Sequence, residues 1–463
     1  EQVVRGYLDR IEKYDGELNS YHEVFTDRAL ERARQVDAGQ VTGPLAGVPV
    51  ALKDVLCTDH GHTTCSSRML ESFQAPYTAT AVQRLEDAGA IILGKTNMDE
   101  FAMGSSCEHC AFGPVGNPWH KQAVPGGSSG GSAAAMAADL CAAAIGTDTG
   151  GSIRQPAAFS GVVGLKPTYG RVSRYGLVAF ASSLDQAGPI TRTIDDAALL
   201  LHAMAGHDAL DSTSANVPVP DDLTQLDAPL DGLRIGIARQ YVSDSNDAAV
   251  NDAVSQAQNI FRDHGAELVE VDLPHTGYGI SVYYILATAE CSSNLARYDG
   301  VHYGHRTDNP RDLMELVARS RSEGFGDEVK RRIMLGTYAL STGYYDAYYL
   351  RALKVRRLIK QDFDRAFENC DAILCPTSPT LPFKRGDRLD DPLKMYMADV
   401  YTVPSSLAGI SAVSLPGGFI DESDGALPIG VQLLGGAFEE TRLLRIARLY
   451  EQAAGHHQRR PRL

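Results

Sequence analysis

The 463 residues contain no hydrophobic run long enough to cross a lipid bilayer. A membrane-spanning helix needs about 20 consecutive apolar residues, and no segment approaches that length. The first residues also lack the charged start and the apolar stretch of a secretory signal peptide. We therefore expect a soluble protein. Because Glu1 stands where an initiator methionine would be, the numbering is expected to begin inside a longer gene product.

Lysine is scarce, and the chain as a whole is acidic. Only 10 of the 43 basic residues are lysine, and the formal net charge is −15. An acidic chain repels phosphate groups, which argues against nucleic-acid binding by a broad basic face. If a nucleic acid takes part in the function, another subunit is expected to hold it. The preference for arginine fits either a GC-rich genome or mild adaptation to salt.

A regular cysteine framework is also missing. The eight cysteines follow no fixed spacing, which predicts free thiols in a reducing compartment, the cytoplasm. One cluster combines ligand types that zinc prefers, namely Cys57, His60, His62 and Cys65, with Cys107 and Cys110 further along the chain. Its spacing matches no closed zinc-binding pattern. We therefore favour packed or surface residues over a metal site and predict no metal in this chain.

Alternating strands and helices are predicted over residues 44–193, where glycine and other small residues are abundant. Apolar runs at residues 47–52 and 90–94 have the length of strands, and a helical pattern over residues 80–88 precedes the second run. This alternation is typical of an α/β sheet covered on both faces. The preceding residues 1–34 have the period of one amphipathic helix, whose apolar face is formed by Val4, Leu8 and Ile11.

The segment at residues 206–232 is rich in Asp, Pro, Ser and Thr, which predicts a surface excursion or a linker. A strand at residues 233–237, a helix at 247–264 and a strand at 266–273 are predicted to follow. This strand–helix–strand unit, about residues 233–273, could form an appended lobe or continue the same sheet, and we favour continuation of the sheet. We see no repeats and no low-complexity tract.

The remainder of the chain is predicted to contain helices and two buried strands. Residues 326–370 have the pattern of one long helix that is rich in tyrosine and arginine. Short apolar runs at residues 372–375 and 428–434 are typical of buried strands. The last predicted helix is amphipathic, and its apolar face contains Leu443, Ile446, Ala447 and Tyr450.

Three short segments stand out from this background. Residues 47–54 place Lys53 at the end of an apolar strand. Residues 125–132 form a Gly/Ser-rich loop that opens a helix of small residues, and residues 146–156 carry the sequence Gly-Thr-Asp-Thr-Gly-Gly-Ser-Ile-Arg-Gln-Pro. Taken alone, such a loop is a phosphate cradle or a tight turn. No lysine follows the glycines as in a P-loop, so phosphate binding is poorly supported.

Single residues in these segments have ordinary explanations as well. An isolated Lys53 would most often be a surface cation, and an isolated Ser152 would most often cap a helix. Together, however, the segments supply what amide hydrolysis needs. Ser152 is a nucleophile, Lys53 is a base once burial keeps it neutral, and Ser128 can relay the proton between them. The backbone N–H groups around Thr149, Gly150 and Gly151 suit an oxyanion hole, because no bulky side chain blocks them.

These motifs closely resemble the amidase signature family. Lys53 and Ser128 are 75 residues apart, and Ser128 and Ser152 are 24 apart, in agreement with that family's pattern. The resemblance implies Ser152 as the acylated nucleophile, Ser128 as a relay held by a cis peptide bond, and Lys53 as the base. It also implies a single α/β/α sandwich around a large mixed twisted sheet. The signature domain would then cover residues 1–463, with a helical segment at 1–40 and a signature core at 44–195.

Within this family the chain is most similar to the glutaminase subunits of tRNA-dependent amidotransferases, and the resemblance covers nearly its whole length. Among the matching segments are residues 94–104, 166–173, 324–333 and 343–349. Such subunits hydrolyse glutamine and work in a heterotrimer with a B and a C subunit. The partner holds the mischarged tRNA. It uses ATP, Mg²⁺ and the released ammonia to amidate this tRNA. No metal or organic cofactor is expected in this chain.

Glutamine carries both an α-carboxylate and an α-ammonium group, so its pocket needs a fixed cation and a fixed anion. The planar fork of an arginine suits the carboxylate. By resemblance, Arg332 is expected to bind the carboxylate, Asp399 the ammonium group, and Tyr283 to line the pocket. The neighbouring Arg331 is the alternative for the first role. Each of these residues could also be an ordinary helix-face or loop residue.

Two other functions remain as alternatives. A stand-alone amidase acting on small or fatty amides would work without partners and would lack the paired arginine and aspartate. A scaffold subunit would perform no chemistry, and the intact triad argues against it. The sequence leaves open whether tRNA(Gln), tRNA(Asn) or both are served.

Overall fold

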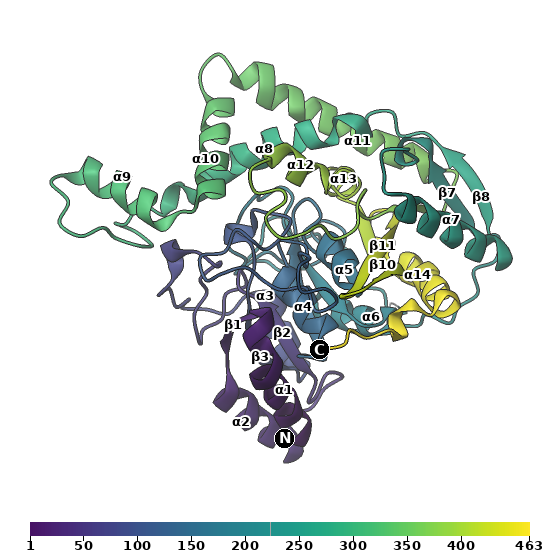
Figure 1. Cartoon of the computed structure of the whole chain (residues 1–463), viewed down its shortest axis with the longest axis horizontal. Coiled ribbons are helices and arrows are strands. Elements are labelled where there is room, and N and C mark those ends of the chain that lie inside the picture. Colours follow the sequence, from purple (N-terminus) through teal and green to yellow (C-terminus); the bar gives the residue numbers. More distant parts are fainter. Residues whose placement is uncertain (223) are drawn as a thin grey trace.

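The computed structural model describes residues 1–222 and 224–463, and one sheet of eleven strands runs through it (Figure 1). In spatial order the strands are β1 (Tyr21–Val24), β3 (Ile91–Thr96), β2 (Pro49–Lys53), β4 (Ala143–Asp148), β6 (Gln186–Thr191), β5 (Val163–Lys166), β10 (Ser411–Glu422), β11 (Gly425–Gly435), β9 (Ala372–Pro376), β7 (Arg234–Ala238) and β8 (Glu267–Val271). Parallel pairs join β2 to β3 and β4, and β7 to β8 and β9, whereas the other neighbours are antiparallel. The predicted mixed sheet is confirmed.

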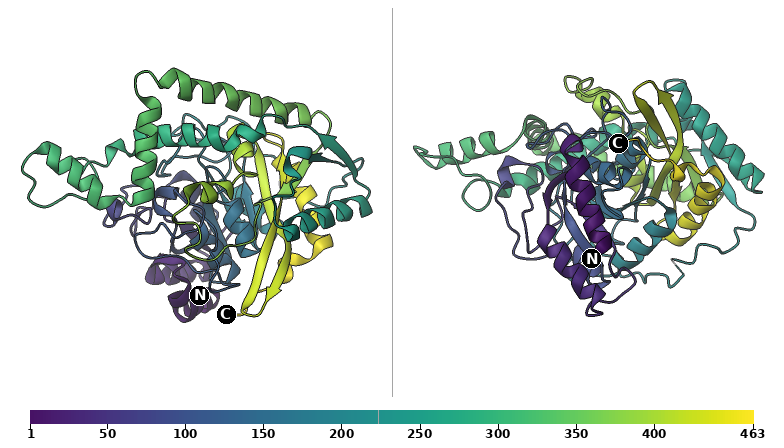
Figure 2. Two further views of the ribbon diagram at one scale, coloured as in Figure 1. Left: turned by 45° about the horizontal axis from the view of Figure 1, so that its top comes forward. Right: turned by 60° about the horizontal axis from the view of Figure 1, so that its bottom comes forward.

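Helices connect the strands and cover the sheet (Figures 1 and 2). The α-helices are α1 (Gln2–Leu18), α2 (Thr26–Asp37), α3 (Thr80–Asp87), α4 (Gly130–Ala137), α5 (Arg154–Ser160), α6 (Ile194–Met204), α7 (Ala248–Asp263), α8 (Gly279–Asn294), α9 (Leu313–Gly324), α10 (Asp327–Leu340), α11 (Arg351–Ala366), α12 (Pro392–Met397), α13 (Val403–Ala408) and α14 (Glu440–Ala454). None of the helices formed by the described residues is long and apolar enough to cross a membrane.

The central strands are buried on both faces of the sheet, which explains their apolar sequences. Val50 and Leu52 of β2, with Ile92 of β3, belong to the core on one face. Their chain neighbours Ala51 and Ile91 belong to a second core on the other face. Side chains of a strand alternate between the two faces, so a strand covered on both sides reads as an uninterrupted apolar run.

The carboxyl ends of β2 and β4 meet at one edge of the sheet, because these neighbouring strands are parallel. β2 ends at Lys53, and β4 ends at Asp148, directly before residues 149–152. Two of the three sequence motifs therefore leave the sheet side by side. In open α/β sheets, ligands bind in the crevice at this edge.

The single helix predicted over residues 1–34 is wrong. α1 ends at Leu18, Asn19 adopts a left-handed conformation with φ of 52°, and β1 then pairs antiparallel with β3 before α2 begins. Asparagine tolerates this conformation better than most residues. The carboxylate of Asp15 stabilises the turn by accepting hydrogen bonds from the N–H groups of Ser20 and Tyr21.

Residues 326–370 are not one helix either. α10 ends at Leu340, and the chain changes direction near Gly343, whose φ of 90° favours glycine. A π-helical turn, η6 (Tyr345–Leu350), then leads into α11. The sequence has a helical period on both sides of the break, so the period does not reveal where α10 ends. One glycine is enough to change the chain direction there.

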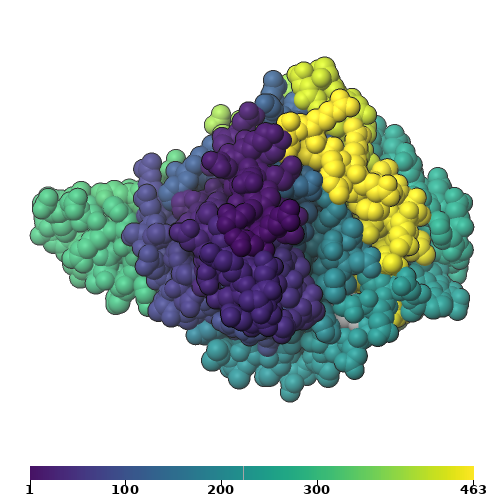
Figure 3. Space-filling view, turned by 90° about the horizontal axis from the view of Figure 1, so that it is seen from below, coloured from purple at the N-terminus to yellow at the C-terminus, as the bar shows by residue number. Residues whose placement is uncertain are grey.

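The segment around residues 206–232 forms turns and extended chain along the surface, apart from residue 223, which lies outside the described residues. β7, α7 and β8 follow, and both strands belong to the same sheet rather than to a separate lobe. At the end of the chain, all four apolar residues expected on one face of the last helix, α14, are buried. Figure 3 shows the N-terminal helices beside the C-terminal segment on one face of the molecule.

Helices α8 and α10 pack very closely, and the packing depends on a glycine. A Cβ atom at Gly336 in α10 would lie 1.8 Å from the carbonyl oxygen of Thr288 in α8. This close approach positions the two helices that carry Tyr283 and Arg332, the expected substrate residues.

Replacing Gly336 by alanine should lower the thermal unfolding midpoint, because the new methyl group forces α8 and α10 apart. Overpacking of this kind costs about 1–3 kcal/mol. Gly6→Ala in α1 is the matched control, since nothing lies within 4 Å of its added methyl group. There, alanine should be neutral or stabilising by up to about 1 kcal/mol. Equal midpoints for the two variants would contradict the expected role of Gly336.

Candidate active site

Lys53 stands at the carboxyl end of β2 and is completely buried. Its Nζ lies 2.7 Å from Ser128 Oγ and 2.9 Å from Thr147 Oγ1. Burial disfavours the charged ammonium form and lowers the pKa of Lys53 to about 8, although nearby anionic groups oppose the shift. Lys53 can therefore be neutral at moderately alkaline pH, as a base must be.

Ser128 lies in a loop that is held from several sides. The peptide bond between Gly127 and Ser128 is cis. The Gly127 N–H group donates to Gln155 Oε1 at 2.9 Å, and Ser128 O accepts from the N–H group of Asp99 at 3.2 Å. A Cβ atom at Gly127 would lie only 2.0 Å from the Asp99 carboxylate. These contacts fix the Ser128 hydroxyl beside Lys53.

Ser152 lies next to this loop, because its carbonyl oxygen accepts a hydrogen bond of 3.2 Å from the N–H group of Ser129. The side of the site at Ser152 is the accessible one, since Ser152 is 8% exposed whereas Lys53 and Ser128 are fully buried. Within the described residues, Ser152 Oγ makes no hydrogen bond. The structure thus joins Lys53 to Ser128 directly and brings Ser152 beside them through the main chain. Catalytic hydrogen bonds are often loose without substrate.

The turn at residues 149–151 is crowded on the side where side chains would point. A Cβ atom at Gly150 would lie 2.7 Å from the Tyr283 ring, and one at Gly151 would lie 2.3 Å from Thr402 Oγ1. Thr402 Oγ1 also donates a hydrogen bond of 2.7 Å to the carbonyl oxygen of Gly150. Glycine is therefore required at both positions, and it lets a substrate approach the backbone N–H groups closely.

A buried ion pair between residues on either side of this turn stabilises it. Asp148 accepts hydrogen bonds of 3.0 Å from both Nε and Nη2 of Arg154, and both side chains are fully buried. The other polar partners of this guanidinium are Thr402, Ser405, Ser406 and Gln432. No role for this pair was predicted, although the two residues flank the nucleophile loop in the sequence.

Asp185 is a second anchor of the turn that sequence reasoning missed. Its Oδ1 accepts a hydrogen bond of 2.7 Å from Thr149 Oγ1, and its Oδ2 accepts from the N–H groups of Phe180 and Ala181. Burial raises the pKa of Asp185 to about 6, although these hydrogen bonds oppose the shift. The Phe180 ring lies 5.6 Å from the Arg332 guanidinium. One carboxylate therefore links the turn to the wall of the expected substrate pocket.

Arg332 and Arg331 differ sharply in environment. Arg332 is 3% exposed, and its guanidinium lies within 5.5 Å of the ring centres of Tyr284 and Tyr396. Its Nε donates to Glu328 Oε1 at 2.8 Å, the only hydrogen bond of this guanidinium among the described residues. Arg331 points outward and pairs with the other oxygen of Glu328. The geometry therefore favours Arg332 as the cation that faces a ligand.

Asp399 supplies a buried carboxyl group with one oxygen unused. Its Oδ2 accepts a hydrogen bond of 2.5 Å from Ser105 Oγ, whereas its Oδ1 is buried without a partner in the described structure. That oxygen would lie 3.0 Å from a Cβ atom at Gly151, so it is close to the nucleophile loop. Burial raises the pKa of Asp399 to about 7. An ammonium group of a ligand would satisfy this oxygen and restore the ionised form.

The Cys/His cluster of the sequence does not assemble around one point. Cys57 and Cys65 are buried, His60 faces Asp59, and His62 faces Glu23. Cys107 and Cys110 donate to carbonyl oxygens of the main chain instead. In the residues that the structure describes, all eight cysteines are free, and no three His, Cys, Asp or Glu side chains come together as a metal site.

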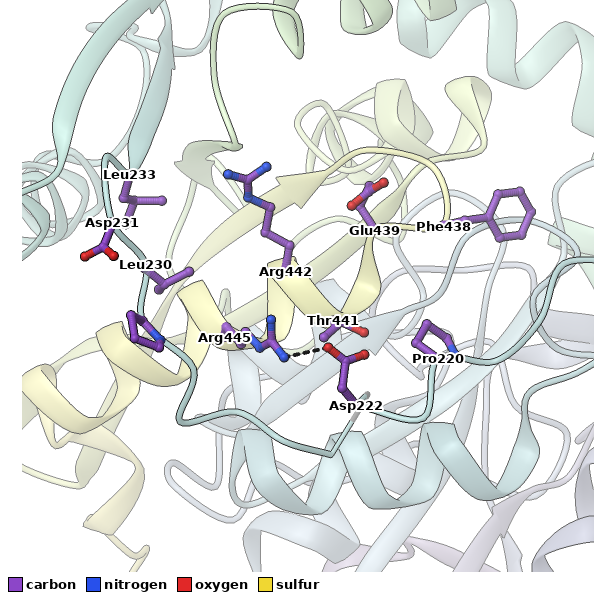
Figure 4. A pocket seen from close by; sticks show the side chains of 11 residues that line it. Pro220, Asp222, Leu230, Asp231, Leu233, Phe438, Glu439, Thr441, Arg442 and Arg445 are labelled. Atoms are coloured by element: carbon purple, nitrogen blue, oxygen red, sulfur yellow. Dashed lines mark hydrogen bonds and ion pairs between the residues drawn. The ribbon is translucent and has the colours of Figure 1, made fainter.

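A separate surface pocket of about 530 Å³ lies between the segment that precedes β7 and the start of α14 (Figure 4). Its charged lining residues are largely paired with one another or with neighbours. Asp222 accepts from Arg445 at 2.7 Å, and Arg442 lies 2.9 Å from Asp371. None of the predicted catalytic or substrate residues lines this pocket, so it is not part of the site.

Comparison with known proteins identifies the family. The family model described as Amidase matches residues 2–444. The chain belongs to the amidase family. This amidase is 57% identical over 466 residues to the A subunit of the glutamyl-tRNA(Gln) amidotransferase of Hahella chejuensis, covering 100% of this chain and 95% of that protein.

Solved structures of relatives share the fold of this amidase. The A subunit of the glutamyl-tRNA(Gln) amidotransferase of Thermotoga maritima superposes with a TM-score of 0.81 at 41% identity, covering 98% of this chain and 91% of that one. The peptide amidase of Stenotrophomonas maltophilia gives the same TM-score at 33% identity, with 99% and 94% of the two chains covered. The α/β architecture expected from the sequence is thereby confirmed.

Amide hydrolysis by this amidase should depend on the neutral form of Lys53. The kcat/KM for an amide substrate is expected to rise about tenfold per pH unit below the pKa near 8 of the substrate-free chain and to level off above it. Below this pKa most Lys53 carries a proton and cannot accept another. Stopped-flow or steady-state rates between pH 6 and 9.5 measure this profile. Lys53→Ala should lower kcat at least about 10²-fold. A pH profile without this rise in the unaltered protein would contradict the assignment of Lys53 as the base.

Proposed function

We propose that this amidase is the glutaminase subunit of a tRNA-dependent amidotransferase. The observation that carries the proposal is a fixed cation and a fixed anion around the nucleophile loop. Arg332 is buried among aromatic rings, and Asp399 has an unused buried oxygen beside Gly151. A zwitterionic amino acid satisfies both, and glutamine adds a carboxamide that can extend toward Ser152.

In the proposed first step, Ser152 Oγ attacks the carboxamide carbon of glutamine while its proton passes to Ser128 and from Ser128 to Lys53. The oxygen of the tetrahedral intermediate accepts hydrogen bonds from backbone N–H groups at Thr149, Gly150 and Gly151. Lys53 then returns the proton through Ser128 to the leaving nitrogen, the C–N bond breaks, and ammonia departs. The glutamyl group remains as an ester on Ser152.

In the second step a water molecule attacks this ester, with Lys53 and Ser128 again accepting its proton. Glutamate leaves, and Ser152 recovers its hydroxyl proton. Thr147 Oγ1, 2.9 Å from Lys53 Nζ, orients the amine throughout. Ser–Lys chemistry of this type requires no metal or organic cofactor in the chain itself.

The ammonia would be used by a partner, as the names of the relatives suggest. In this proposal the chain assembles with B and C subunits in the cytoplasm, where aminoacyl-tRNA is consumed in protein synthesis. The partner holds mischarged tRNA, uses ATP and Mg²⁺ to activate its glutamyl or aspartyl group, and amidates it to form Gln-tRNA(Gln) or Asn-tRNA(Asn). The net charge of −15 supports assigning the tRNA to the partner rather than to this chain.

A stand-alone amidase is the second candidate, and the likeness to a peptide amidase favours it. That enzyme class would need no partner. Its substrates lack the pair of opposite charges for which Arg332 and Asp399 are suited. A scaffold without chemistry is less consistent with a fully buried lysine held beside a serine.

Ammonia release from glutamine tests the proposal. The purified chain should release ammonia and glutamate, and the rate should rise when B and C subunits, ATP and mischarged tRNA are added. A coupled glutamate dehydrogenase assay measures both conditions. Turnover of simple amides without any turnover of glutamine would favour the stand-alone amidase, and no turnover in any mixture would favour the scaffold.

Substitution of the two neighbouring arginines tests the pocket. Arg332→Ala should raise the KM for glutamine at least about tenfold, because a buried charge-assisted hydrogen bond to the substrate carboxylate is lost. Arg331→Ala is the matched control and should leave KM within about twofold, since its side chain points to solvent. If Arg331→Ala raised KM while Arg332→Ala did not, the assignment of the carboxylate site would be wrong.

A further inference from the structure

Helix α10 presents two chemically different faces. Its inner face carries Glu328 and Arg332 toward the site, and both are buried. Its outer face carries Met334, Leu335 and Tyr338, which are 72%, 46% and 51% exposed. A helix that binds substrate on one side thus shows large apolar side chains to solvent on the other.

The exposed side chains of α10 continue onto the turn that follows. The ring of Tyr338 lies 4.4 Å from that of Tyr344 and 6.3 Å from that of Tyr348, centre to centre. Tyr344 and Tyr348 are also 5.9 Å apart, and both are exposed. Hereafter the term tyrosine face denotes the surface formed by Met334, Leu335, Tyr338, Tyr344 and Tyr348.

The composition of the tyrosine face is typical of a protein interface. Tyrosine and methionine are enriched at the centres of interfaces, where rigid rings bury large areas at little entropic cost. Clusters of exposed apolar side chains on a folded protein commonly mark such contacts. The π-helical turn η6, which carries Tyr348, is a rare element that often occurs at functional positions.

A positively charged stretch follows the tyrosine face in the chain and borders it at the start of α11. Residues 341–364 contain five basic residues and three acidic ones, and two of the three, Asp362 and Asp364, are already paired with other side chains. Arg351, Lys354 and Arg357 recur every third residue along α11 and are exposed, and none of them forms an ion pair within the described residues. A partner that covers the tyrosine face and meets α11 is therefore expected to present carboxylates at the edge of an apolar patch.

We propose that the tyrosine face is the docking surface for the ammonia-accepting partner subunit, an inference that rests on the proposed function. The cationic border disfavours a second copy of this chain, because two such borders would repel each other. Nucleic acid is disfavoured as well, since the centre of the surface is apolar. A partner docked here would contact the outer face of α10, the helix whose inner face holds Arg332 in the expected substrate pocket. Assembly and glutamine binding would then be coupled through one rigid element.

Leu335→Glu tests the proposal, because it places a charge within the tyrosine face at an exposed apolar position. Leu199→Glu on α6 is the matched control, an exposed helical leucine of similar exposure, 42%. Isothermal titration with the purified B and C subunits should show at least tenfold weaker binding for Leu335→Glu and unchanged binding for Leu199→Glu. A second variant, Lys354→Glu, should weaken binding by a smaller factor that shrinks as salt is added.

Basal glutaminase activity and the thermal midpoint of each isolated variant show that the chain is folded, and both should match the unaltered protein. Normal assembly of Leu335→Glu, with an active unaltered complex, overturns the docking surface and leaves the proposed function standing. Failure of the unaltered chain to assemble or to hydrolyse glutamine overturns both. Two other results would also overturn the proposed occupant. One is that the isolated chain forms a dimer that Leu335→Glu abolishes. The other is that Leu335→Glu weakens tRNA binding but leaves the affinity for the B and C subunits normal.

Discussion

The buried contact between Lys53 Nζ and Ser128 Oγ is the interaction on which the proposed chemistry depends. An amine is a useful base only when it is neutral, and removal from water favours the neutral form. The sheet provides this environment, because β2 lies among other strands and is covered on both faces. Serine can then be activated without histidine. The position of a base at a strand end is thus a consequence of the layered architecture.

Several other buried polar groups keep the nucleophile loop in place. Asp148 and Arg154 brace it from below, and Asp185 holds the Thr149 hydroxyl. Charges buried in this way are stabilising only when they are fully hydrogen bonded, and these are. Asp399 is the exception, because its Oδ1 is unsatisfied in the described residues. This unsatisfied carboxylate oxygen, buried beside a rigid turn, could accept a hydrogen bond from a cationic group of a ligand.

Helices α8 and α10 carry the other half of the pocket, and their close packing at Gly336 makes them one unit. The unit is polar and aromatic toward the substrate and apolar toward solvent. In the proposed assembly, a partner bound to the outer face of α10 would act on the pocket without touching the substrate. The physical basis is the rigidity of a closely packed helix pair, which transmits a contact on one side to the other.

Much about this protein is determined by the sequence alone. The apolar run that ends at Lys53 and the glycines at 150 and 151 predict a strand end and a tight turn, because both depend on local backbone geometry. The candidate triad with Ser128 came from the resemblance to the amidase signature family, whose spacing the sequence shares. Tertiary structure decided the rest. Helical period could not reveal the breaks at Asn19 and Gly343, where one left-handed residue turns the chain. The resemblance named Arg332 and left Arg331 as the alternative, and only the packed structure shows which of the two side chains is buried. Asp185 was missed, since its burial and its partners arise only when distant segments pack.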